Sequence, residues 1–281
     1  MPDQTHHWLS LDQGKLIASR DYLPLLEENG LATFDKFMQL DSGQVIRSVP
    51  GRKTVRIELK SRSGPVPAYL KRYDPAYLSI KRLALRFFRW PGSEDEAMRE
   101  WRMIQVLRAH GIPTATPIAA GQLKSWGTTT RSFVLTAEIS GALPGDEWVK
   151  SADSQKRRQL IKPLAKLTRK FHGQGFIHKD YYLAHIFVAE QSSQLQLSLI
   201  DLQRVQGPAR FRERWLVKDL GELAYSAQKL GVSRTDLMRF YKSCFGKNRL
   251  DQKDKRFIRK ILHRVNWLFG RTPKYGETPR L

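Results

Sequence analysis

A predicted β-hairpin that carries two aspartates and a histidine constrains the fold of this chain more than any other stretch. Its first part is FIHKDYYLAHIFV, residues 176–188, and its second is LSLIDLQRVQ, residues 197–206. Both parts contain the short apolar runs that are typical of strands, and a polar turn separates them. We expect the hairpin to hold Asp180 and His185 on one loop and Asp201 just past the returning strand, close enough to share a ligand.

Two carboxylates and an imidazole that converge suit phosphoryl transfer, in which one acid orients the attacking hydroxyl and another holds the metal that bridges the phosphates. The segment HGQGFIHKDYYLAHIFV, followed by LIDLQR, resembles the protein-kinase catalytic loop and the bacterial lipopolysaccharide core kinases of the heptose/Kdo kinase family. The resemblance covers residues 20–230. It implies an α+β, bilobal protein-kinase-like fold with a small antiparallel-sheet N-lobe and a mainly helical C-lobe.

The resemblance implies a role for each charged residue of the hairpin. Asp180 would orient the acceptor hydroxyl as catalytic base, Lys179 would offset charge on the transferred group, and Asp201 would carry magnesium. His185 stands where protein kinases place an asparagine, and three roles stay open for it: metal binding through water, binding of Mn²⁺, or positioning of substrate. Asp-Leu-Gln at 201–203 replaces the kinase Asp-Phe-Gly, so we do not expect regulation by phosphorylation of an activation loop.

The stretch before the hairpin predicts the N-lobe. Strands are expected at residues 44–48, 54–59 and 68–73, and a helix that ends in a glycine and a proline is expected over residues 94–113. Gly51, in the turn between the first two strands, stands where kinases place a glycine-rich loop over the nucleotide phosphates. An ordinary Pro-Gly hairpin turn is the alternative interpretation.

Two charged residues in these elements are expected to pair. Lys71 lies in the third strand, where it resembles the phosphate-binding lysine of kinases, and a solvated edge lysine is the alternative. Glu100 lies on the helix stripe that also carries Ile104 and Leu107, and a carboxylate on a core-facing stripe needs a cation. We expect Lys71 to bind the phosphates and Glu100 to hold Lys71, with Glu96 as the alternative partner.

The connector between the lobes is expected to begin at Glu138 and Ile139, after a buried strand at residues 133–137. Backbone groups of the kinase connector bind the adenine edge, so the resemblance makes both residues part of the nucleotide site. We predict three regions. They are an N-terminal helical extension over residues 1–42 with two short helices in 15–40, an N-lobe over residues 43–140, and a C-lobe over residues 141–281 with basic C-terminal helices.

The C-lobe is expected to open with a helix over residues 154–172, in which Pro163 predicts a kink or a late start. A second helix is expected from Val217. The resemblance gives Asp219 and His178 the role of supporting the catalytic loop. The alternative for Asp219 is an acid favoured by the dipole near a helix N-terminus.

Charge is the most unusual bulk property of the chain, with 49 Lys and Arg against 27 Asp and Glu and a net charge of +22. Residues 52–89 hold eleven basic and two acidic side chains, and residues 247–280 hold eleven and three. Such a surface suits nucleic acid, an anionic bilayer or a phosphorylated glycolipid, or it only keeps the protein soluble. Residues 78–92 and 255–268 interleave cations with apolar side chains, which is typical of a segment lying on a membrane, and ordinary packing is the alternative.

The sequence predicts a cytosolic protein. Its apolar runs are shorter than the roughly 18 to 20 residues that span a bilayer, and the N-terminal residues lack the pattern of a signal peptide. The single cysteine, Cys244, excludes an intramolecular disulfide and fits a reducing compartment. Because of the basic surfaces, we expect a peripheral protein on the cytoplasmic face of the inner membrane of a Gram-negative bacterium.

The resemblance therefore predicts an ATP-dependent kinase that uses Mg²⁺, or Mn²⁺, to phosphorylate a sugar hydroxyl of the lipopolysaccharide inner core. Heptose is the expected sugar, because histidine at position 185 fits the heptose-kinase branch better than the Kdo-kinase branch. The acceptor would be an anionic glycolipid, and we expect no nucleic-acid partner, because no recognised motif supports one. The alternative is a catalytically silent kinase-like module that binds membrane lipid. The kinase prediction requires four side chains around one nucleotide in a cleft between the lobes, namely Lys71, Glu100, Asp180 and Asp201.

Overall fold

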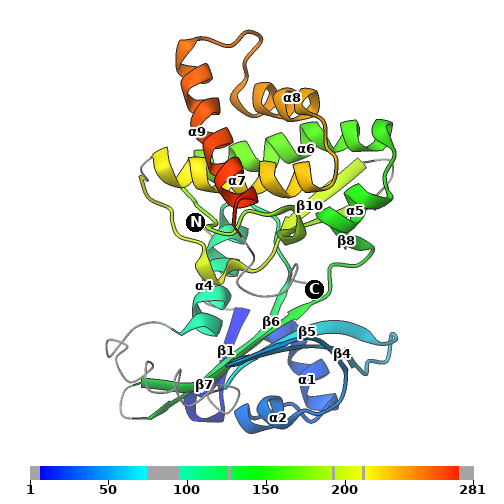
Figure 1. Ribbon diagram of the computed structural model, residues 1–281. Helices are drawn as coiled ribbons and strands as arrows, with labels where there is room; N and C mark the ends of the chain where they lie inside the picture. Colours follow the sequence, from blue (N-terminus) through cyan, green and yellow to red (C-terminus); the bar gives the residue numbers. More distant parts are fainter. Residues whose placement is uncertain (1–6, 75–94, 126–127, 192–193, 211–212, 272–281) are drawn as a thin grey trace. The chain divides into compact units, whose positions relative to one another are not determined.

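The computed structural model describes residues 7–74, 95–125, 128–191, 194–210 and 213–271 (Figure 1). Within them the chain forms two compact units. Unit 1 takes in the chain up to Gln105 together with Ala115–Glu138, and unit 2 takes in Val106–Thr114 and the chain from Ile139 onward. The predicted membrane-binding segment at residues 78–92 lies outside the described residues.

Within the described residues, unit 1 is built on an antiparallel sheet with the strand order β1-β2-β6-β7-β5-β4-β3. The strands predicted between residues 44 and 73 are confirmed as β3, β4 and β5. The strands are β1 (Trp8–Leu11), β2 (Leu16–Ser19), β3 (Gln44–Val49), β4 (Arg52–Leu59), β5 (Val66–Tyr73), β6 (Pro117–Ser125) and β7 (Thr128–Ala137). The helices are α1 (Leu23–Glu28), α2 (Phe34–Gln39), α4 (Glu96–Ala109) and the 3₁₀ helices η2 (Asp12–Gly14) and η3 (Arg20–Tyr22).

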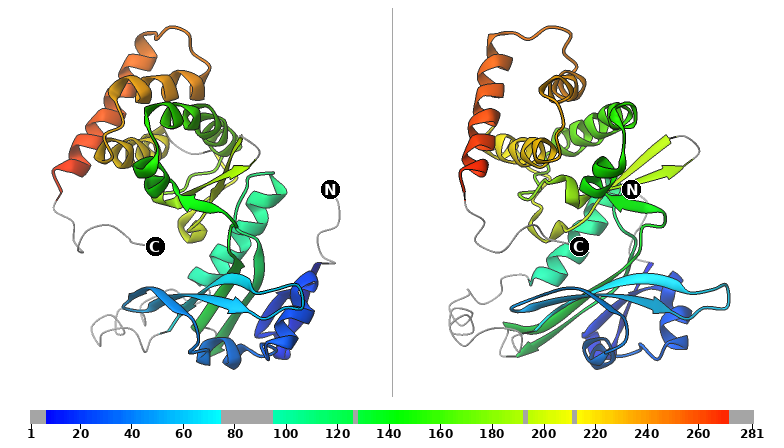
Figure 2. Two further views of the ribbon diagram at one scale, coloured as in Figure 1. Left: turned by 90° about the vertical axis from the view of Figure 1, so that its right-hand side faces the viewer. Right: turned by 45° about the vertical axis from the view of Figure 1, so that its right-hand side comes forward.

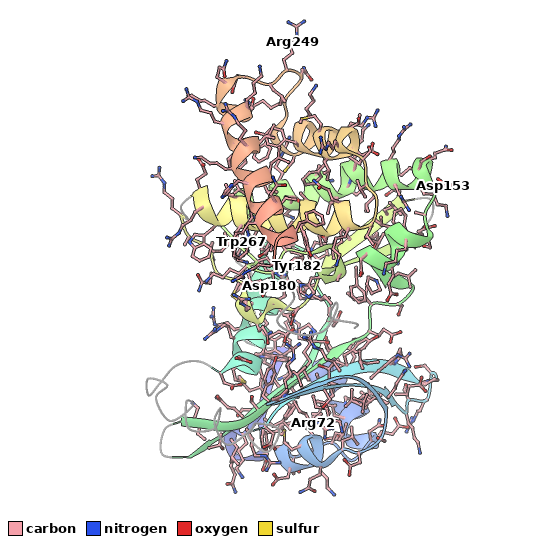
Figure 3. All side chains as sticks on the ribbon, in the orientation of Figure 1. Arg72, Asp153, Asp180, Tyr182, Arg249 and Trp267 are labelled. Carbon is pink, nitrogen blue, oxygen red and sulfur yellow. The ribbon has the colours of Figure 1, made fainter. Side chains whose placement is uncertain are left out.

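Side chains along β5 alternate between the two faces of the sheet, as the period of a strand requires. Leu70 is buried in the cluster that also contains the core residues of α1 and α2, which cover this face (Figure 2). Arg72 is buried too, and its guanidinium donates to the carbonyls of Met38 and Leu40 at 2.8 and 2.9 Å. These carbonyls lie at the C-terminal end of α2, where an α-helix leaves its acceptors without partners. Arg72 (labelled in Figure 3) therefore joins the sheet to α2.

The opposite face of β5 meets α4. Tyr73 packs there with Ala97 and Trp101 of α4, and the indole of Trp101 makes an edge contact with the ring of Trp8, with centroids 4.7 Å apart. Lys71 shares this face because it lies two residues before Tyr73. The strand period and the position of α4 thus place the lysine opposite the helix that carries the predicted glutamate.

The first forty residues differ from the predicted helical extension. Two short helices are present, and they flank the break at Asn29-Gly30, but β1 and β2 are strands of the same sheet. β2 pairs with β6, with Leu16 opposite Gly121. Because this partner lies about a hundred residues along the chain, the pairing leaves no local pattern in the sequence.

Unit 2 contains a three-stranded antiparallel sheet in the order β10-β9-β8 and, among the described residues, five α-helices. The strands are β8 (Ala142–Pro144), β9 (Ile186–Gln191) and β10 (Gln194–Leu199). The helices are α5 (Gly145–Ser151), α6 (Ser154–Gly173), α7 (Glu213–Lys229), α8 (Arg234–Phe245), α9 (Gln252–Phe269) and the 3₁₀ helices η5 (Leu183–His185) and η6 (Leu202–Arg204).

The predicted hairpin and the predicted first helix of unit 2 are both present. β9 and β10 pair with Ile186 opposite Leu199, which brings the two ends of the hairpin together. α6 begins at Ser154, where the Asp153 side chain accepts from the backbone N–H of Lys156, and it continues through Pro163. The late start that Pro163 predicted is therefore wrong. No helix of the described residues is long and apolar enough to span a bilayer.

Candidate active site

The loop that carries Asp180 lies in unit 2, between α6 and η5. Its start is paired with the segment that follows β10, because the backbones of Ile177 and Gln206 exchange two hydrogen bonds of 2.9 Å. Lys179 has a φ of 69°, in the left-handed region that residues with a side chain rarely adopt. Such a backbone persists only where surrounding contacts hold it.

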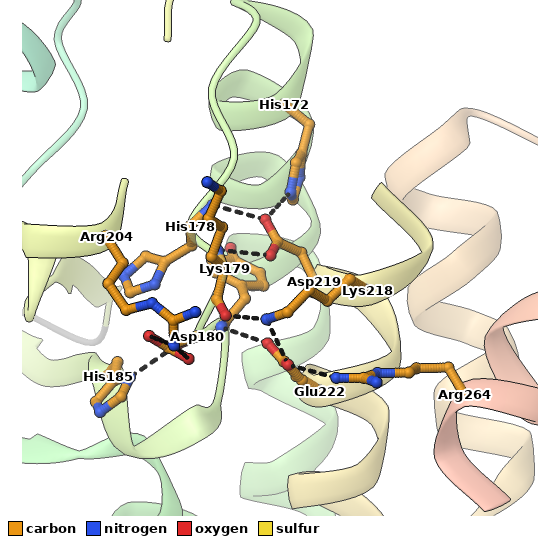
Figure 4. A network of polar contacts seen from close by, with 11 residues as sticks. His172, His178, Lys179, Asp180, His185, Arg204, Lys218, Asp219, Glu222 and Arg264 are labelled. Atoms are coloured by element: carbon orange, nitrogen blue, oxygen red, sulfur yellow. Dashed lines mark hydrogen bonds and ion pairs between the residues drawn. The ribbon is translucent and has the colours of Figure 1, made fainter. Parts of the chain in front are cut away.

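Asp219 of α7 makes these contacts from a buried position (Figure 4). Its carboxylate accepts hydrogen bonds from the backbone N–H groups of His178 at 2.7 Å and Lys179 at 2.8 Å, and it lies 3.0 Å from Nε2 of His172. Burial alone would raise the pKa of Asp219, but the hydrogen bonds with His172 and the loop hold that pKa below its ordinary value. The carboxylate is therefore ionised at neutral pH.

Two more side chains on the same face of α7 continue the contact with the loop. Glu222 lies three residues after Asp219 and accepts from the backbone N–H of Tyr181 at 3.3 Å. Ser226 lies seven residues after Asp219 and accepts from the backbone N–H of Leu183 at 3.0 Å. One stripe of a single helix thus binds the backbone of the loop on both sides of Asp180.

Glu222 also joins the loop to α9 (Figure 4). Its Oε1 accepts from Nζ of Lys218 at 2.6 Å and from Nη2 of Arg264 at 3.0 Å, and Lys218 donates in addition to the carbonyl of Lys179. Gly221 permits the close crossing of the two helices, because a Cβ at this position would lie 2.5 Å from Cγ of Arg264. Burial raises the pKa of Glu222, and the two cations oppose the rise.

Asp180 itself is in contact with Arg204. Nη1 of Arg204 donates to Oδ1 and Oδ2 of Asp180 at 2.7 and 2.8 Å. Burial raises the pKa of Asp180 above its ordinary value, and Arg204 and Lys218 oppose that rise. A partly desolvated carboxylate is a better proton acceptor than an exposed one, while the cations keep it available in the charged form.

His185 and Asp201 lie beside Asp180. Nδ1 of His185 is 2.8 Å from the backbone oxygen of Asp180, and this contact assigns the proton of the neutral ring to Nδ1. Nε2 of the same ring is 3.6 Å from Oδ2 of Asp201. Asp201 has a φ of 57° and immediately precedes η6. The hairpin therefore brings its two aspartates and its histidine together.

The side chains of Asp201 and His185 can be compared with the ligands that a divalent cation requires. Among the described residues, no group of three or more His, Cys, Asp or Glu side chains is arranged to hold a metal ion. Mg²⁺ at phosphate-transfer sites is bound by one or two carboxylates, with substrate phosphates and water supplying the other ligands. The Asp201 carboxylate fits such a site. Nε2 of His185, whose Nδ1 is engaged, is the second protein atom available to a cation or to a metal-bound water.

His178 is a fully buried residue of the loop. Its Nε2 lies 3.0 Å from the carbonyl oxygen of Ile200, and its ring stacks on that of His185, with centroids 5.9 Å apart and an angle of 18° between the planes. Burial, followed by the nearby imidazole of His185, lowers the pKa of His178 to about 4.

The free energy of unfolding is therefore expected to fall on acidification. Between the ordinary pKa of 6.5 and a folded-state value of about 4, the unfolded chain binds a proton at His178 that the folded chain does not. Stability from this group is complete above the first value and is lost as the pH falls towards the second, by up to about 3 kcal/mol. Urea denaturation from about pH 7 to about pH 4 should show this slope in the wild type and in the surface variant His263→Gln, and a shallower slope in His178→Gln. An equal slope in all three proteins would contradict the assignment.

Unit 1 contains the second group of predicted residues. Nζ of Lys71 donates to Oε1 of Glu100 at 2.5 Å, and the two side chains are only 14% and 4% exposed. The expected ion pair is therefore present. Gly51 lies in the turn between β3 and β4 with a φ of 84°, and its carbonyl accepts from the backbone N–H of Asp74 at 3.2 Å. This turn needs glycine for its positive φ whether or not it contacts a nucleotide.

The two predicted connector residues fall on either side of the boundary between the units. The carboxylate of Glu138 is paired with Arg56 within unit 1, at 2.5 Å from Nε. Its backbone N–H donates to the carbonyl of Pro67 at 2.9 Å, so this N–H is engaged and is not a donor for an adenine edge. In unit 2 the carbonyl of Ile139 accepts from the backbone N–H of Ala142 at 3.1 Å.

Sequence reasoning missed Arg204 and the acceptors that follow Asp219 on α7. Arg204 lies three residues after Asp201, and its contact with Asp180 becomes visible only when η6 turns back towards the loop. Glu222 and Ser226 were recognisable in principle, because they follow Asp219 at helical spacing. The signal that points to them is a stripe of polar side chains on a helix whose neighbouring residues are apolar and buried.

An antiparallel sheet with a buried lysine–glutamate pair, and a loop in which a partly buried aspartate lies near a second aspartate and a histidine, are features of a protein-kinase-like phosphotransferase. Comparison with known proteins gives the family. The model of the lipopolysaccharide kinase (Kdo/WaaP) family matches residues 36–243. The chain belongs to this family, which makes it a kinase that acts in lipopolysaccharide biosynthesis.

Curated relatives come from both branches of the family. The lipopolysaccharide core heptose(I) kinase WaaP of Escherichia coli strain K12 is 30% identical over 214 residues, which cover 73% of this chain and 78% of the relative. WaaP of Pseudomonas aeruginosa is 26% identical over 262 residues, which cover 89% and 94%. The 3-deoxy-D-manno-octulosonic acid kinase of Xylella fastidiosa strain 9a5c is 25% identical over 150 residues, which cover 53% and 57%.

A solved structure supports the fold. It is described as WaaP in complex with acyl carrier protein, and it superposes with a TM-score of 0.66 at 24% sequence identity, covering 90% of this chain and 99% of the other. The bilobal kinase-like fold that the resemblance implied is confirmed.

Proposed function

We propose that this chain transfers the γ-phosphate of ATP to a heptose hydroxyl of the lipopolysaccharide inner core. The observation that carries the proposal is the loop around Asp180, in which a partly buried carboxylate stands beside Asp201 and His185. The choice of heptose is supported by the relatives named as heptose kinases, whose similarity extends over more of this chain than that of the Kdo kinases.

Each residue of the proposal has a role that its surroundings support. Asp180 would accept or orient the proton of the acceptor hydroxyl, and Arg204 would hold its carboxylate in the charged form. Lys71, held by Glu100, would bind the nucleotide phosphates as a point charge. Asp201 would hold Mg²⁺, which neutralises charge on the phosphates when it is bound. His185 would orient that cation or a water bound to it.

The experiment that tests this function is transfer of label from γ-labelled ATP to purified core glycolipid that lacks the phosphate. We expect label in the glycolipid, dependence on Mg²⁺, and loss of transfer when the cation is chelated. The folded protein leaving the glycolipid unlabelled, while known family members label it in the same assay, would overturn the proposal.

We propose in addition that the protein works as a peripheral protein on the cytoplasmic face of the inner membrane. The support is the basic C-terminal part of the chain, whose helix α9 exposes Leu262, Trp267 and Phe269 among its cations. Flotation with vesicles of anionic phospholipid should recover the protein at low salt and release it at high salt. Equal recovery with neutral vesicles would argue against a role of this charge.

An acyl carrier protein is a further partner that we propose, because the solved structure of WaaP contains one. Unit 2 has a cavity of about 360 Å³ between α6, α7, α8 and α9, and aliphatic and aromatic side chains form most of its lining. Such a cavity suits an acyl chain. Native mass spectrometry should detect a one-to-one complex with the acylated carrier protein and much less with the unacylated form. Equal binding of both forms would exclude the cavity as the acyl site.

A further inference from the structure

A groove between α7 and α9 lies outside the residues discussed so far as catalytic. It has a volume of about 840 Å³. Cationic side chains dominate its lining: Arg214 comes from the first turn of α7, and Arg259, Lys260 and Arg264 come from one stripe of α9. His263 and Trp267 of α9 complete that stripe.

The positive charge of the groove is only partly balanced. Lys260 pairs with Glu213 at 2.6 Å, and Arg264 pairs with Glu222 at 3.0 Å. Within the part of the chain that the structure describes, Arg214 and Arg259 have no carboxylate partner. The guanidinium of Arg214 lies 5.0 Å from the centroid of the Trp215 ring, and Nε of Arg259 donates to the carbonyl of Lys255 at 3.3 Å.

Trp267 orients guanidinium groups at the groove and beside it. The guanidinium carbons of Arg264 and Arg271 lie 4.2 and 4.0 Å from the centroid of its ring, and the residue is 41% exposed. Guanidinium groups that are oriented by an aromatic ring lose less freedom on binding an anion, and their planar forks match phosphate and carboxylate oxygens. The groove therefore favours an anionic ligand with hydrogen-bond acceptors.

The groove is also connected to the loop of Asp180. Arg264 contacts Glu222, which accepts the backbone N–H of Tyr181 next to Asp180. Burial raises the pKa of Tyr182, nearby Glu222 and Asp180 raise it further, and Arg264 opposes the rise, so Tyr182 is close both to Asp180 and to a residue that lines the groove. Trp267, Tyr182 and Asp180 are labelled in Figure 3.

We propose that the groove between α7 and α9 binds anionic groups of the lipopolysaccharide core, phosphate or carboxylate, while a sugar hydroxyl of the same molecule lies at Asp180. This proposal rests on the proposed function and assigns its acceptor site. Contact with bilayer headgroups is less well supported, because Leu262 and Phe269 do not line the groove and Trp267, which does, is stacked with two guanidinium groups. Arg264 lines the groove and also donates to Glu222, which holds the loop. A ligand that binds in the groove and reaches Asp180 would account for this shared residue.

The double variant Arg214→Gln/Arg259→Gln tests the proposal, since both side chains are exposed and leave no carboxylate without its partner. The probe is deacylated core oligosaccharide, which is soluble and keeps its anionic groups. Calorimetry should give a dissociation constant about tenfold higher for the variant than for the wild type, as expected for the loss of two charged donors. The matched control is Lys162→Gln/Lys166→Gln, which removes the same charge from the exposed side of α6 and should bind the probe as the wild type does.

The same proteins are then assayed for phosphate transfer to the oligosaccharide. A variant with a raised KM for oligosaccharide and an unchanged KM for ATP would support the acceptor site. Equal affinity of the variant and the control would overturn the groove assignment even if the wild type is an active kinase. Weaker binding of the variant to anionic vesicles alone would also overturn it, in favour of a membrane contact. Weaker oligosaccharide binding by the variant, together with an inactive wild type, would support the groove and contradict the proposed function.

Discussion

Asp180→Asn is expected to lower kcat for phosphate transfer roughly a thousandfold, within the range that a general base contributes. The amide keeps the size of the side chain and one acceptor oxygen for Arg204, so the loop should keep its conformation. What it loses is the negative charge that orients the acceptor hydroxyl and takes its proton. The measurement is the initial rate of transfer from ATP to core glycolipid at saturating concentrations of both substrates.

The control for this prediction is Asp153→Asn, which changes an exposed aspartate at the start of α6 (labelled in Figure 3). Asparagine is also a good N-cap, so this variant should retain its stability and activity. Asp180→Asn should in addition bind Mg-ATP with nearly wild-type affinity, because its role concerns the acceptor. Wild-type turnover by Asp180→Asn would show that the base lies elsewhere.

Asp219→Ala is expected to lower the free energy of unfolding by about 3 kcal/mol or more and to abolish most of the activity. The substitution leaves the buried N–H of His178, the partly buried N–H of Lys179 and Nε2 of His172 without their acceptor, and each unsatisfied buried donor costs about 1–3 kcal/mol. It also releases Lys179 from its left-handed backbone conformation. Correct orientation of the reacting groups raises the rate of a reaction by orders of magnitude, so the activity of the folded fraction should fall about a hundredfold or more.

Urea denaturation and transfer assays on the same preparations separate these two effects. Asp236→Ala is a suitable comparison, since this partly exposed aspartate in the first turn of α8 accepts from Arg239 and Ser233 and should contribute about 1 kcal/mol. A further variant, Asp219→Asn, keeps the volume but replaces one acceptor oxygen with a donor that faces the loop. If Asp219→Ala loses no more stability than Asp236→Ala, the loop is held by other contacts.

The sequence was most informative where a local pattern has a single structural solution. Period-two alternation predicted β10, and the apolar stripe of α6 predicted a helix that begins at Ser154 in the structure. The pairing of Lys71 with Glu100 followed from the apolar helix stripe that carries Glu100 and from the resemblance of the third strand to the kinase strand with the phosphate-binding lysine. A buried charged side chain can reach only a few partners, and among these it pairs with the one of opposite charge.

The rest depended on contacts between residues that are far apart in the chain. β1 and β2 are too short to show a periodic pattern, and their place in the sheet depends on β6. Arg204 reaches Asp180 because the 3₁₀ helix η6 turns the chain back towards the loop. In a chain with 49 basic residues, the sequence cannot select the one arginine that reaches a given carboxylate.

The most direct measurement of the central claim is the position of the new phosphate on the acceptor. Core glycolipid is incubated with Mg-ATP and the wild-type protein, and fragmentation mass spectrometry then locates the added phosphoryl group. A phosphoryl group on an inner-core heptose, absent from the reaction with Asp180→Asn, is the predicted result. A phosphoryl group on the Kdo residue would contradict the choice of heptose, and unmodified glycolipid from an active, folded preparation would contradict the account as a whole.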